Sequence, residues 1–327
     1  MKLKASQAVE VLRAAGEPTR LRILALLARE ELAVLELCGV LDQSQPRVSR
    51  HLKLLAEAGL VERFPDGAWV FYRLTGAGPN LEASAGGLVR EVLDRIDPAD
   101  PVLTRDAERL SAVFAERAAV ASDYFARNAA RWDEIRSLYI AEGDVEAAIL
   151  KAAGPGPYRR LVDLGSGTGR MLTLLGPRAQ AALGLDLSQQ MLNIARNHVS
   201  QAGLQVCELR HGDIFGTRLP DGDADLVVVH QVLHYLTDPA AAVKEAARIT
   251  APGGKLIIVD FAPHKLEFLR EQHAHRRLGF SDAEIRRWLG EGAFEVRSQT
   301  LPPARDAGLT VKIWTAERAQ ARQRTAA

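Results

Sequence analysis

Three glycines at alternate positions, Gly165, Gly167 and Gly169, follow a short apolar run that contains one acid, Asp163. A mostly apolar run over Met171–Leu175 comes next, so the pattern predicts a buried strand, a tight turn and the start of a helix. Because glycine has no side chain, the turn can adopt positive φ and a ligand can approach its backbone closely. The amide groups that open the next helix then face that ligand with a partial positive charge. The spacing differs from the G-x-G-x-x-G of dinucleotide folds, so the glycines alone are consistent with either a ligand site or a simple turn.

Two further acids follow the next two strand patterns. The apolar run 181–185 leads into Asp186, where a second parallel strand should end and where a carboxylate suits bidentate hydrogen bonding to ribose hydroxyls. A third run, Leu204–Leu209, precedes Asp213, whose carboxylate could accept a hydrogen bond from an adenine amino group. Each acid alone is consistent with a solvated carboxylate at a strand end. Acids at three successive strand ends favour a ligand site instead.

With these residues, the chain resembles the class I S-adenosylmethionine-dependent methyltransferases over roughly Tyr124 to Ala316. The segments that carry the resemblance are the first motif Val162–Gly169, the ribose acid in Gly184–Asp186, the adenine site Gly212–Asp213, the fourth strand Asp223–His230 and the turn Thr250–Leu256 into the fifth strand. The resemblance implies S-adenosyl-L-methionine as cofactor and S-adenosyl-L-homocysteine as its product. The residues that it assigns to the cofactor are Tyr124, Asp163, Gly165, Ser166, Gly167, Gly169, Asp186, Leu187, Met191, Asp213, Ile214 and His230.

The resemblance also places the substrate and the reactive methyl group beside the segment after the fourth strand, which carries His230 and His234. Methyl transfer is an in-line displacement at a sulfur that is already cationic, so the enzyme mainly aligns the reactants and excludes water. A base helps only if the acceptor carries a proton. His230 and His234 are therefore candidate catalytic bases, and the alternative is that this segment orients the cofactor through its main chain.

Near the N-terminus, apolar spacing predicts a helix after Pro18 and a short helix over Leu32–Val40. A third helix is expected from Ser44, a favourable N-cap residue, with Pro46 tolerated in its first turn. The Asp66-Gly67 pair then predicts a hairpin turn between two strands. A helix with cationic and amide side chains at its start can enter a major groove while a hairpin wing holds phosphates, so the pattern favours a winged helix-turn-helix. The alternative is a helical interaction domain with a solvated basic face.

The segment Ser44–Leu52 closely resembles the recognition helix of ArsR-type winged-helix repressors, and the resemblance covers about residues 5–75. It implies a symmetric homodimer that binds a double-stranded DNA operator. The residues assigned to DNA are Ser44, Gln45, Arg47, Ser49, Arg50, His51 and Lys53. Metal-sensing members carry paired cysteines on the preceding helix, where this chain has Ala33 and Leu35. The single thiol of Cys38 cannot make a multi-ligand soft-metal site, so no metal is predicted.

The fold class expected from these patterns is α/β, with an N-terminal winged helix-turn-helix domain and a Rossmann-like seven-stranded methyltransferase domain. Strands and helices alternate after residue 151, which predicts a parallel sheet with helices on both faces. Phe294–Leu301 and Leu309–Trp314 should form an antiparallel edge pair. The expected divisions are 1–96 for DNA binding and dimerisation, 97–150 for a linker and helical cap, 151–317 for the methyltransferase domain and 318–327 for a frayed tail.

The linker follows a helical stretch over Leu81–Ile96 and is expected at Asp97–Pro101, because its prolines and acids cannot continue a helix. The helical pattern that follows contains Tyr124, Phe125 and Trp132. These rings either form core packing between the domains or, by resemblance to related methyltransferases, a cap over the cofactor cleft.

A polar segment over Asp260–Phe280 contains three histidines and three arginines. His273 and His275 are two residues apart, so one helix face cannot present both to a metal. The segment is interpreted either as a polar substrate lid or anion pocket, or as a solvated basic helix face. Arsenic methyltransferases use several cysteines, and Cys207 alone in this domain argues against that substrate.

The composition limits which partners and which cellular compartment can be expected. The net charge of +1 gives no general electrostatic argument for nucleic acid, so DNA binding must rest on local geometry. The two cysteines lie far apart in apolar surroundings, which indicates buried free thiols in a reducing compartment. No apolar run approaches the roughly 20 residues of a membrane span, and no signal peptide is indicated, so we expect a cytoplasmic protein.

Two functions agree with this sequence. In the first, a DNA-binding regulator also methylates a small molecule. In the second, the methyltransferase fold only senses S-adenosylmethionine or S-adenosylhomocysteine and reports it to the DNA-binding domain. A third interpretation, an enzyme that uses the winged helix merely to dimerise, predicts no operator binding.

Overall fold

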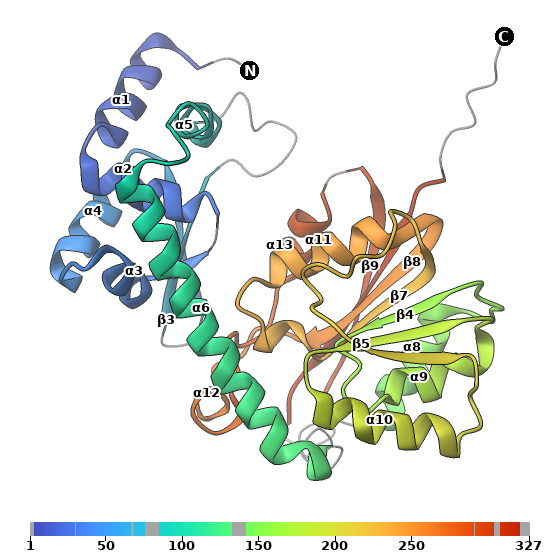
Figure 1. The fold of residues 1–327 in the computed structure, drawn as a ribbon. Coiled ribbons are helices and arrows are strands. Elements are labelled where there is room, and N and C mark those ends of the chain that lie inside the picture. Colours follow the sequence, from blue (N-terminus) through green and yellow to red (C-terminus); the bar gives the residue numbers. More distant parts are fainter. Residues whose placement is uncertain are drawn as a thin grey trace, which may run out of the picture. The chain divides into compact units, whose positions relative to one another are not determined.

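The computed structural model of the chain describes residues 3–29, 31–66, 69–75, 85–132, 142–290, 292–303 and 308–320. It forms two compact units, Met1–Ala118 and Ala119–Ala327. The division falls inside α6 (Pro101–Asn128), a single helix that contributes residues to both units (Figure 1). The functional boundaries expected at residues 97 and 151 remain predictions. Parts of three expected features, Gly67 in the hairpin turn, the start of the helix at Leu81 and the last residues of the tail, lie outside the described residues.

The described part of the first unit contains short helices, a three-stranded sheet and the start of α6. Its further elements are α1 (Ala5–Ala15), α2 (Pro18–Leu27), β1 (Leu32–Ala33), α3 (Val34–Leu41), α4 (Gln45–Glu57), β2 (Val61–Asp66), β3 (Trp69–Leu74) and α5 (Ala85–Leu93). The helix predicted over Leu32–Val40 begins two residues late, because Leu32 and Ala33 pair with Tyr72 and Phe71 of β3. β2 and β3 form the predicted antiparallel hairpin.

The helix pair α3 and α4 is joined by a tight turn in which Asp42 adopts the left-handed conformation at φ 55°. α4 begins after Ser44, as predicted, with Pro46 in its first turn. The Ser44 side chain makes no capping hydrogen bond, which corrects the expected role of its hydroxyl. The apolar face of α4 (Val48, Leu52, Leu55) is buried in the core of the unit.

The first half of α6 is fixed to the first unit by charged side chains. Asp106 is buried and accepts two hydrogen bonds of 2.6 Å from the guanidinium of Arg22 in α2. Arg109 donates to the carbonyl of Val40 at 3.1 Å, at the end of α3. Asp100, in the predicted linker, accepts from the first free amides of α6, so the linker ends as the N-terminal cap of this helix.

The second unit is built on a seven-stranded sheet of order β6-β5-β4-β7-β8-β10-β9. The strands are β4 (Leu161–Leu164), β5 (Ala182–Asp186), β6 (Cys207–His211), β7 (Ala224–His230), β8 (Thr250–Phe261), β9 (Phe294–Leu301) and β10 (Val311–Arg318). The first five pair in parallel, and β10 is antiparallel to both β8 and β9, which confirms the predicted fold class and edge pair. β10 includes Arg318, which pairs with Phe294, so the expected frayed tail does not begin there.

Helices cover both faces of this sheet (Figure 1). They are α8 (Glu142–Ala153), α9 (Arg170–Leu175), α10 (Gln189–Gln201), α11 (Pro239–Ile249), α12 (Phe268–His273) and α13 (Asp282–Leu289), with short 3-10 turns η2 (Ala129–Arg131), η3 (Gly176–Arg178) and η4 (Leu233–Tyr235). One core joins the sheet to α11 and α13, and a second joins it to α8 and α9. Among the described residues, no helix is both long and apolar enough to cross a membrane.

Candidate functional site

The turn after β4 has the conformation that its glycines predict. Gly165, Gly167 and Gly169 adopt φ values of 74°, 51° and 83°, in the region that L side chains rarely occupy. A Cβ atom on Gly165 would lie 2.5 Å from the Val232 side chain, and one on Gly169 would lie 3.1 Å from Cβ of Ala195. The space over Gly167 is open by comparison, since a Cβ there would meet nothing closer than Nε1 of Trp132 at 3.8 Å. Two glycines therefore serve packing within the protein, and Gly167 is the one that faces open space.

The amide groups of this turn are already used inside the protein. Gly165 and Ser166 donate to the carbonyl of Leu185 on β5, and Gly169 donates to the carbonyl of Ser166. Gly167 donates to the Asp186 carboxylate at 2.8 Å. These four amides are therefore not available to a ligand. The turn offers a ligand space and the Ser166 hydroxyl, which is buried and has no hydrogen-bond partner among the described residues.

Asp186 ends β5 beside the glycine turn, and its carboxylate is held in one orientation. One oxygen accepts from the amide of Gly167 and the other from the amide of Ser188, both at 2.8 Å. Burial raises the pKa of the Asp186 carboxyl, although these two amides and the nearby His211 oppose the change. Each oxygen keeps a second lone pair, so the carboxylate can still accept hydrogen bonds from two ligand hydroxyls.

The remaining predicted residues on this side follow β5 and β6. Leu187 is 53% exposed directly after Asp186, whereas Met191 and Ile214 are buried. Asp213 is exposed, and one of its oxygens accepts from the amide of Phe215 at 2.9 Å, which fixes the carboxylate after β6. Asp163, on β4, is fully buried. The sheet order places the ends of β4, β5 and β6 side by side, as the sequence pattern requires.

The ends of β7 and β8 carry histidines and a second buried carboxylate. His230 is the last residue of β7 and is partly exposed. His234 follows in η4 and is 1% exposed, and its Nδ1 lies 2.8 Å from Oδ1 of Asp260, which is 0% exposed near the end of β8. The sequence showed Asp260 as the first residue of a polar segment and assigned it no role, because its partner lies 26 residues away along the chain.

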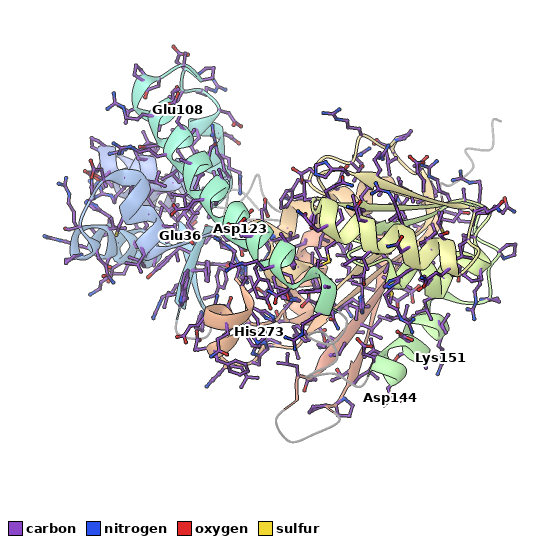
Figure 2. All side chains as sticks on the ribbon, turned by 60° about the horizontal axis from the view of Figure 1, so that its bottom comes forward. Glu36, Glu108, Asp123, Asp144, Lys151 and His273 are labelled. Carbon is purple, nitrogen blue, oxygen red and sulfur yellow. The ribbon has the colours of Figure 1, made fainter. Side chains whose placement is uncertain are left out.

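A group of aromatic rings from distant segments packs next to these histidines within the second unit. Tyr124, Phe125 and Trp132 come together as the sequence spacing allowed, with Phe125 and Trp132 ring centres 5.2 Å apart. Phe125 also packs edge-on against Tyr235 of η4 at 4.8 Å. The Tyr124 hydroxyl lies 2.9 Å from Nδ1 of His273, which Figure 2 labels on the short helix α12. Since Trp132 also lies over Gly167, the rings connect the glycine turn to the segment after β7.

The histidine-rich segment after β8 is not a solvated helix face. α12 ends at His273, and Ala274, with φ 54°, turns the chain so that His275 and Arg277 are buried. Arg277 pairs with Glu284 of α13 at 2.9 Å. The backbone amides of Arg276 and Arg277 both donate to the carbonyl of His234, so this segment packs directly against η4.

Most of the residues predicted to contact DNA are exposed at the start and along one side of α4. These exposed residues are Ser44, Gln45, Arg47, Ser49, Arg50 and Lys53. His51 is turned inward, with Nδ1 3.6 Å from a carboxylate oxygen of Glu17 at the start of α2. The structure therefore separates His51 from the other predicted DNA-binding side chains.

Neither cysteine is as buried as the sequence indicated. Cys38 and Cys207 are free and half-buried, and burial raises the pKa of each thiol, with the charge of Asp163 adding to the effect at Cys207. In the described part of the chain, no group of three or more His, Cys, Asp or Glu side chains could hold a metal ion.

A cavity of about 390 Å³ lies between α8 and the strands β9 and β10. Its polar lining includes Asp144 and Lys151 of α8, both labelled in Figure 2, and Gln299 of β9. Leu309 and Val311 form part of its apolar lining. None of the predicted site residues lines this cavity.

Comparison with known families gives two separate matches. A model of the bacterial regulatory proteins of the arsR family matches residues 17–63, and a model of the methyltransferase domain matches residues 162–258. The first match contains α2 to α4, and the second contains the glycine turn and the strands from β5 to β7.

Individual relatives follow the same division. The arsenical resistance operon repressor of Escherichia coli (strain K12) is 43% identical over 84 residues, which cover 25% of this chain and 69% of the repressor. A phosphatidylethanolamine N-methyltransferase of Cereibacter sphaeroides is 36% identical over 148 residues, 43% of this chain and 72% of that enzyme. The uncharacterized methyltransferase YcgJ of Bacillus subtilis (strain 168) is 26% identical over 140 residues, 42% of this chain and 54% of YcgJ. The chain thus spans about half the length of YcgJ and about seven tenths of the other two.

The two matches and the two compact units lead to the same assignment. The chain belongs to the arsR family of bacterial regulatory proteins through its first unit and to the methyltransferases through the sheet domain of its second.

Proposed function

We propose that this protein is a DNA-binding transcriptional regulator whose second unit binds S-adenosyl-L-methionine and transfers its methyl group to a small molecule. The observation that carries the proposal is the carboxyl edge of β4, β5 and β6, where three acids surround a turn with an open glycine. Ligands of open parallel sheets bind at this edge. Carboxylates there select a ligand that offers hydroxyl, amino or ammonium donors, as an adenosine joined to an amino acid does.

The residues present fit this cofactor. The buried Ser166 hydroxyl lacks a partner among the described residues, so a ligand polar group in the turn would satisfy it. Asp186 would receive the ribose hydroxyls, Asp213 the adenine amino group and Asp163 the ammonium group, directly or through water. Leu187, Met191 and Ile214 would border the adenine, and Tyr124 and His230 the methionine side of the site. When bound, the cofactor supplies a methyl group on a cationic sulfur.

The chain's own residues would align an acceptor and exclude water from it. The rings of Tyr124, Phe125 and Trp132 pack together, and Trp132 lies near Gly167 of the glycine turn. This arrangement supports the role of a cap over the cofactor. His230 ends β7 and His234 follows it, at the same edge of the sheet as the cofactor residues. Either imidazole is a candidate to receive a proton from the acceptor.

The first unit is proposed to be a winged helix that reads DNA with α4 and holds phosphates with the β2–β3 hairpin. The exposed cations Arg47, Arg50 and Lys53 on α4 support this role. A homodimer would place two such helices on a two-fold symmetric operator.

A second candidate function is a regulator that senses the cofactor or its product without turnover. One observation favours it: α6 is a single helix whose Asp106 binds Arg22 beside the helix pair and whose Tyr124 belongs to the aromatic group at the cofactor turn. If α6 has two arrangements and the cofactor binds them with different affinities, cofactor binding would change the protein's affinity for DNA. DNA would change the affinity for the cofactor by the same coupling free energy.

Calorimetry and gel shifts test both functions. Purified protein is titrated with S-adenosylmethionine and S-adenosylhomocysteine, and DNA from upstream of its gene is shifted with and without each. Labelled cofactor incubated with a metabolite pool should yield a labelled product if the protein is an enzyme. Cofactor that binds and alters the shift but is never consumed would favour the sensor, and absence of binding at millimolar cofactor would contradict both.

A further inference from the structure

The pair formed by His234 and Asp260 is the least exposed ionisable contact described at the carboxyl edge of the sheet. Oδ1 of Asp260 lies 2.8 Å from Nδ1 of His234 and also accepts a hydrogen bond of 2.8 Å from the backbone amide of Phe261. A carboxylate only accepts hydrogen bonds, so it fixes the proton of the neutral imidazole on Nδ1. The lone pair of the imidazole is then on Nε2, the nitrogen that faces away from Asp260.

Two buried polar atoms beside this pair lack partners. Oδ2 of Asp260 and Nδ1 of His275 make no hydrogen bond within the described residues, although His275 is only 7% exposed and its ring lies 4.2 Å from that of His234. Buried polar atoms in folded proteins nearly always have a partner from the protein, from water or from a ligand. The position therefore calls for a small polar group that the described protein does not supply.

Among the described ionisable groups around the His234–Asp260 pair, the Asp260 carboxylate is the negative group that is not paired with an arginine. Burial, followed by the nearby His234, His264, His273 and Arg270, holds the pKa of His275 far below its usual range, so His275 stays neutral. Burial also raises the pKa of the Tyr235 hydroxyl well above its usual value, with the charges of Tyr124 and Asp260 adding to the effect. Arg270 and Arg277 are paired with Glu267 and Glu284, respectively. A proton arriving on His234 would thus be stabilised by the Asp260 carboxylate.

We propose that the acceptor of methyl transfer is a hydroxyl compound, that His234 removes its proton and that Asp260 is the positioning residue that fixes the tautomer of His234. The inference rests on the proposed function. It adds the class of acceptor, and it selects His234 over His230 as the base because Asp260 contacts His234. In the step, the O–H bond breaks and its proton goes to Nε2 of His234. The electron pair on oxygen forms the bond to the methyl carbon, and the pair of the carbon–sulfur bond leaves with the sulfur of the cofactor.

The His–Asp pair favours an acceptor that must lose a proton, such as a hydroxyl, over a metal-bound or already ionised acceptor. In the described residues the histidines and carboxylates do not form a group able to bind a metal. A thiolate needs no base, so a preorganised His–Asp pair would give it no advantage. A hydroxyl needs a base at neutral pH, and Nδ1 of His275, whose ring lies 4.2 Å from that of His234, can also hydrogen-bond to it.

The test compares Asp260→Asn with the wild type on two defined probes, catechol and 4-nitrothiophenol, with labelled S-adenosylmethionine. The first probe carries its proton at neutral pH and the second is already a thiolate. The side-chain amide introduced by this substitution can donate to Nδ1 of His234 and move the imidazole proton to Nε2, so transfer to catechol should fall at least about 100-fold. Transfer to the thiolate should fall less than about threefold, since no proton is removed. Asp221→Asn, which changes an exposed acid paired with Arg248, is the matched control.

Calorimetry separates failure of this inference from failure of the proposed function. If the wild type binds no cofactor, the proposed function fails. If it binds cofactor but methylates neither probe, or methylates only the thiolate, the hydroxyl acceptor is wrong. Equal losses on both probes in Asp260→Asn, at unchanged cofactor affinity, would show a structural role and overturn the positioning assignment.

A spectroscopic measurement on the wild type needs no folded variant at Asp260. Nitrogen-15 spectra of histidine-labelled protein report which ring nitrogen carries the proton, and the His234 signals are identified as those absent from His234→Gln. We expect a proton on Nδ1 and an unprotonated Nε2 at neutral pH. A proton found on Nε2 would overturn the proposal, because that nitrogen could not then act as the base.

Discussion

The two candidate functional surfaces of this chain are built in opposite ways. In the first unit, the predicted DNA-binding side chains lie on one continuous helix, α4, and project away from its buried face. In the second, the candidate site is assembled from the ends of five strands and from α6, and its charged groups are buried or bonded to backbone amides. Side chains on α4 can therefore be replaced one at a time, whereas a replacement at the sheet edge would alter packing as well as ligand binding.

The second unit is itself divided. The ends of β4 to β6 present carboxylates around an open turn, which suits a ligand rich in donors. The ends of β7 and β8 present imidazoles, one buried carboxylate and aromatic rings, which suit proton transfer away from water. Variants that affect only one half would show that binding and chemistry are separable here.

The largest expected effect is on stability and concerns Gly165. In Gly165→Ala the new Cβ would meet the stiff Val232 side chain at 2.5 Å and also adopt φ 74°. We expect a loss of about 3 kcal/mol in the free energy of unfolding in urea, from overpacking together with backbone strain. Gly203→Ala is the matched control, because Gly203 has φ 69° but no neighbour within 4 Å, and it should lose only about 1 kcal/mol. Equal losses in the two variants would mean that the turn is not tightly packed.

The second effect is on the affinity for S-adenosylmethionine at the ends of β4 to β6, where the carboxylates lie. Asp186→Ala removes the acceptor proposed for the ribose and the partner of the Gly167 amide. Two hydrogen bonds to a charged group are expected to be worth about 3 kcal/mol together, so calorimetry should show S-adenosylmethionine binding weakened about 100-fold. Asp221→Ala, which removes an exposed acid elsewhere in the same unit, should bind as the wild type does. An unchanged affinity in Asp186→Ala would contradict the ribose assignment.

The third effect is smaller and tests the exposed helix. Arg50→Ala should weaken DNA binding about tenfold and reduce the slope of log affinity against log salt by about 1, because one phosphate contact is lost. Arg13→Ala, which removes an exposed arginine on α1, serves as the control and should leave both unchanged. If Arg50→Ala lowers affinity without changing the salt slope, Arg50 contacts bases or structure rather than phosphate, and if nothing changes, α4 is not the reading helix.

Sequence reasoning was most successful where the functional residues are contiguous or follow a repeating pattern. The alternation of strands and helices predicted the sheet of the second unit, and the Asp66-Gly67 pair predicted the hairpin of β2 and β3. The three acids could be found because Asp163 and Asp186 lie at or near the ends of the β4 and β5 patterns and Asp213 comes shortly after β6.

The failures share a physical cause, which is contact between residues far apart in the chain. His51 belongs to the recognition segment, but its imidazole is mostly covered, with Nδ1 3.6 Å from a carboxylate oxygen of Glu17. The amides of the glycine turn are used by Leu185 and Asp186 on the neighbouring strand, which the local pattern could not show. The His234–Asp260 contact likewise requires β7 and β8 to be neighbours, and only the sheet order supplies that information.

The smallest expected effect is the pH dependence of cofactor binding, and it depends on Asp186. Burial raises the pKa of this carboxyl in the free protein, and ribose hydroxyls donate stronger hydrogen bonds to its ionised form than to its protonated form. Binding therefore lowers this pKa, so affinity is complete at pH values above the pKa of the free protein and falls as pH decreases through it. One proton is involved, so the loss is at most tenfold per pH unit, and it begins at a higher pH than for an ordinary aspartate. Calorimetry across the acidic range should show this decline in the wild type but not in Asp186→Asn, whose weaker affinity should stay flat. A decline of the same shape in both proteins would place the titrating group elsewhere and would remove Asp186 as the acid that holds the ribose.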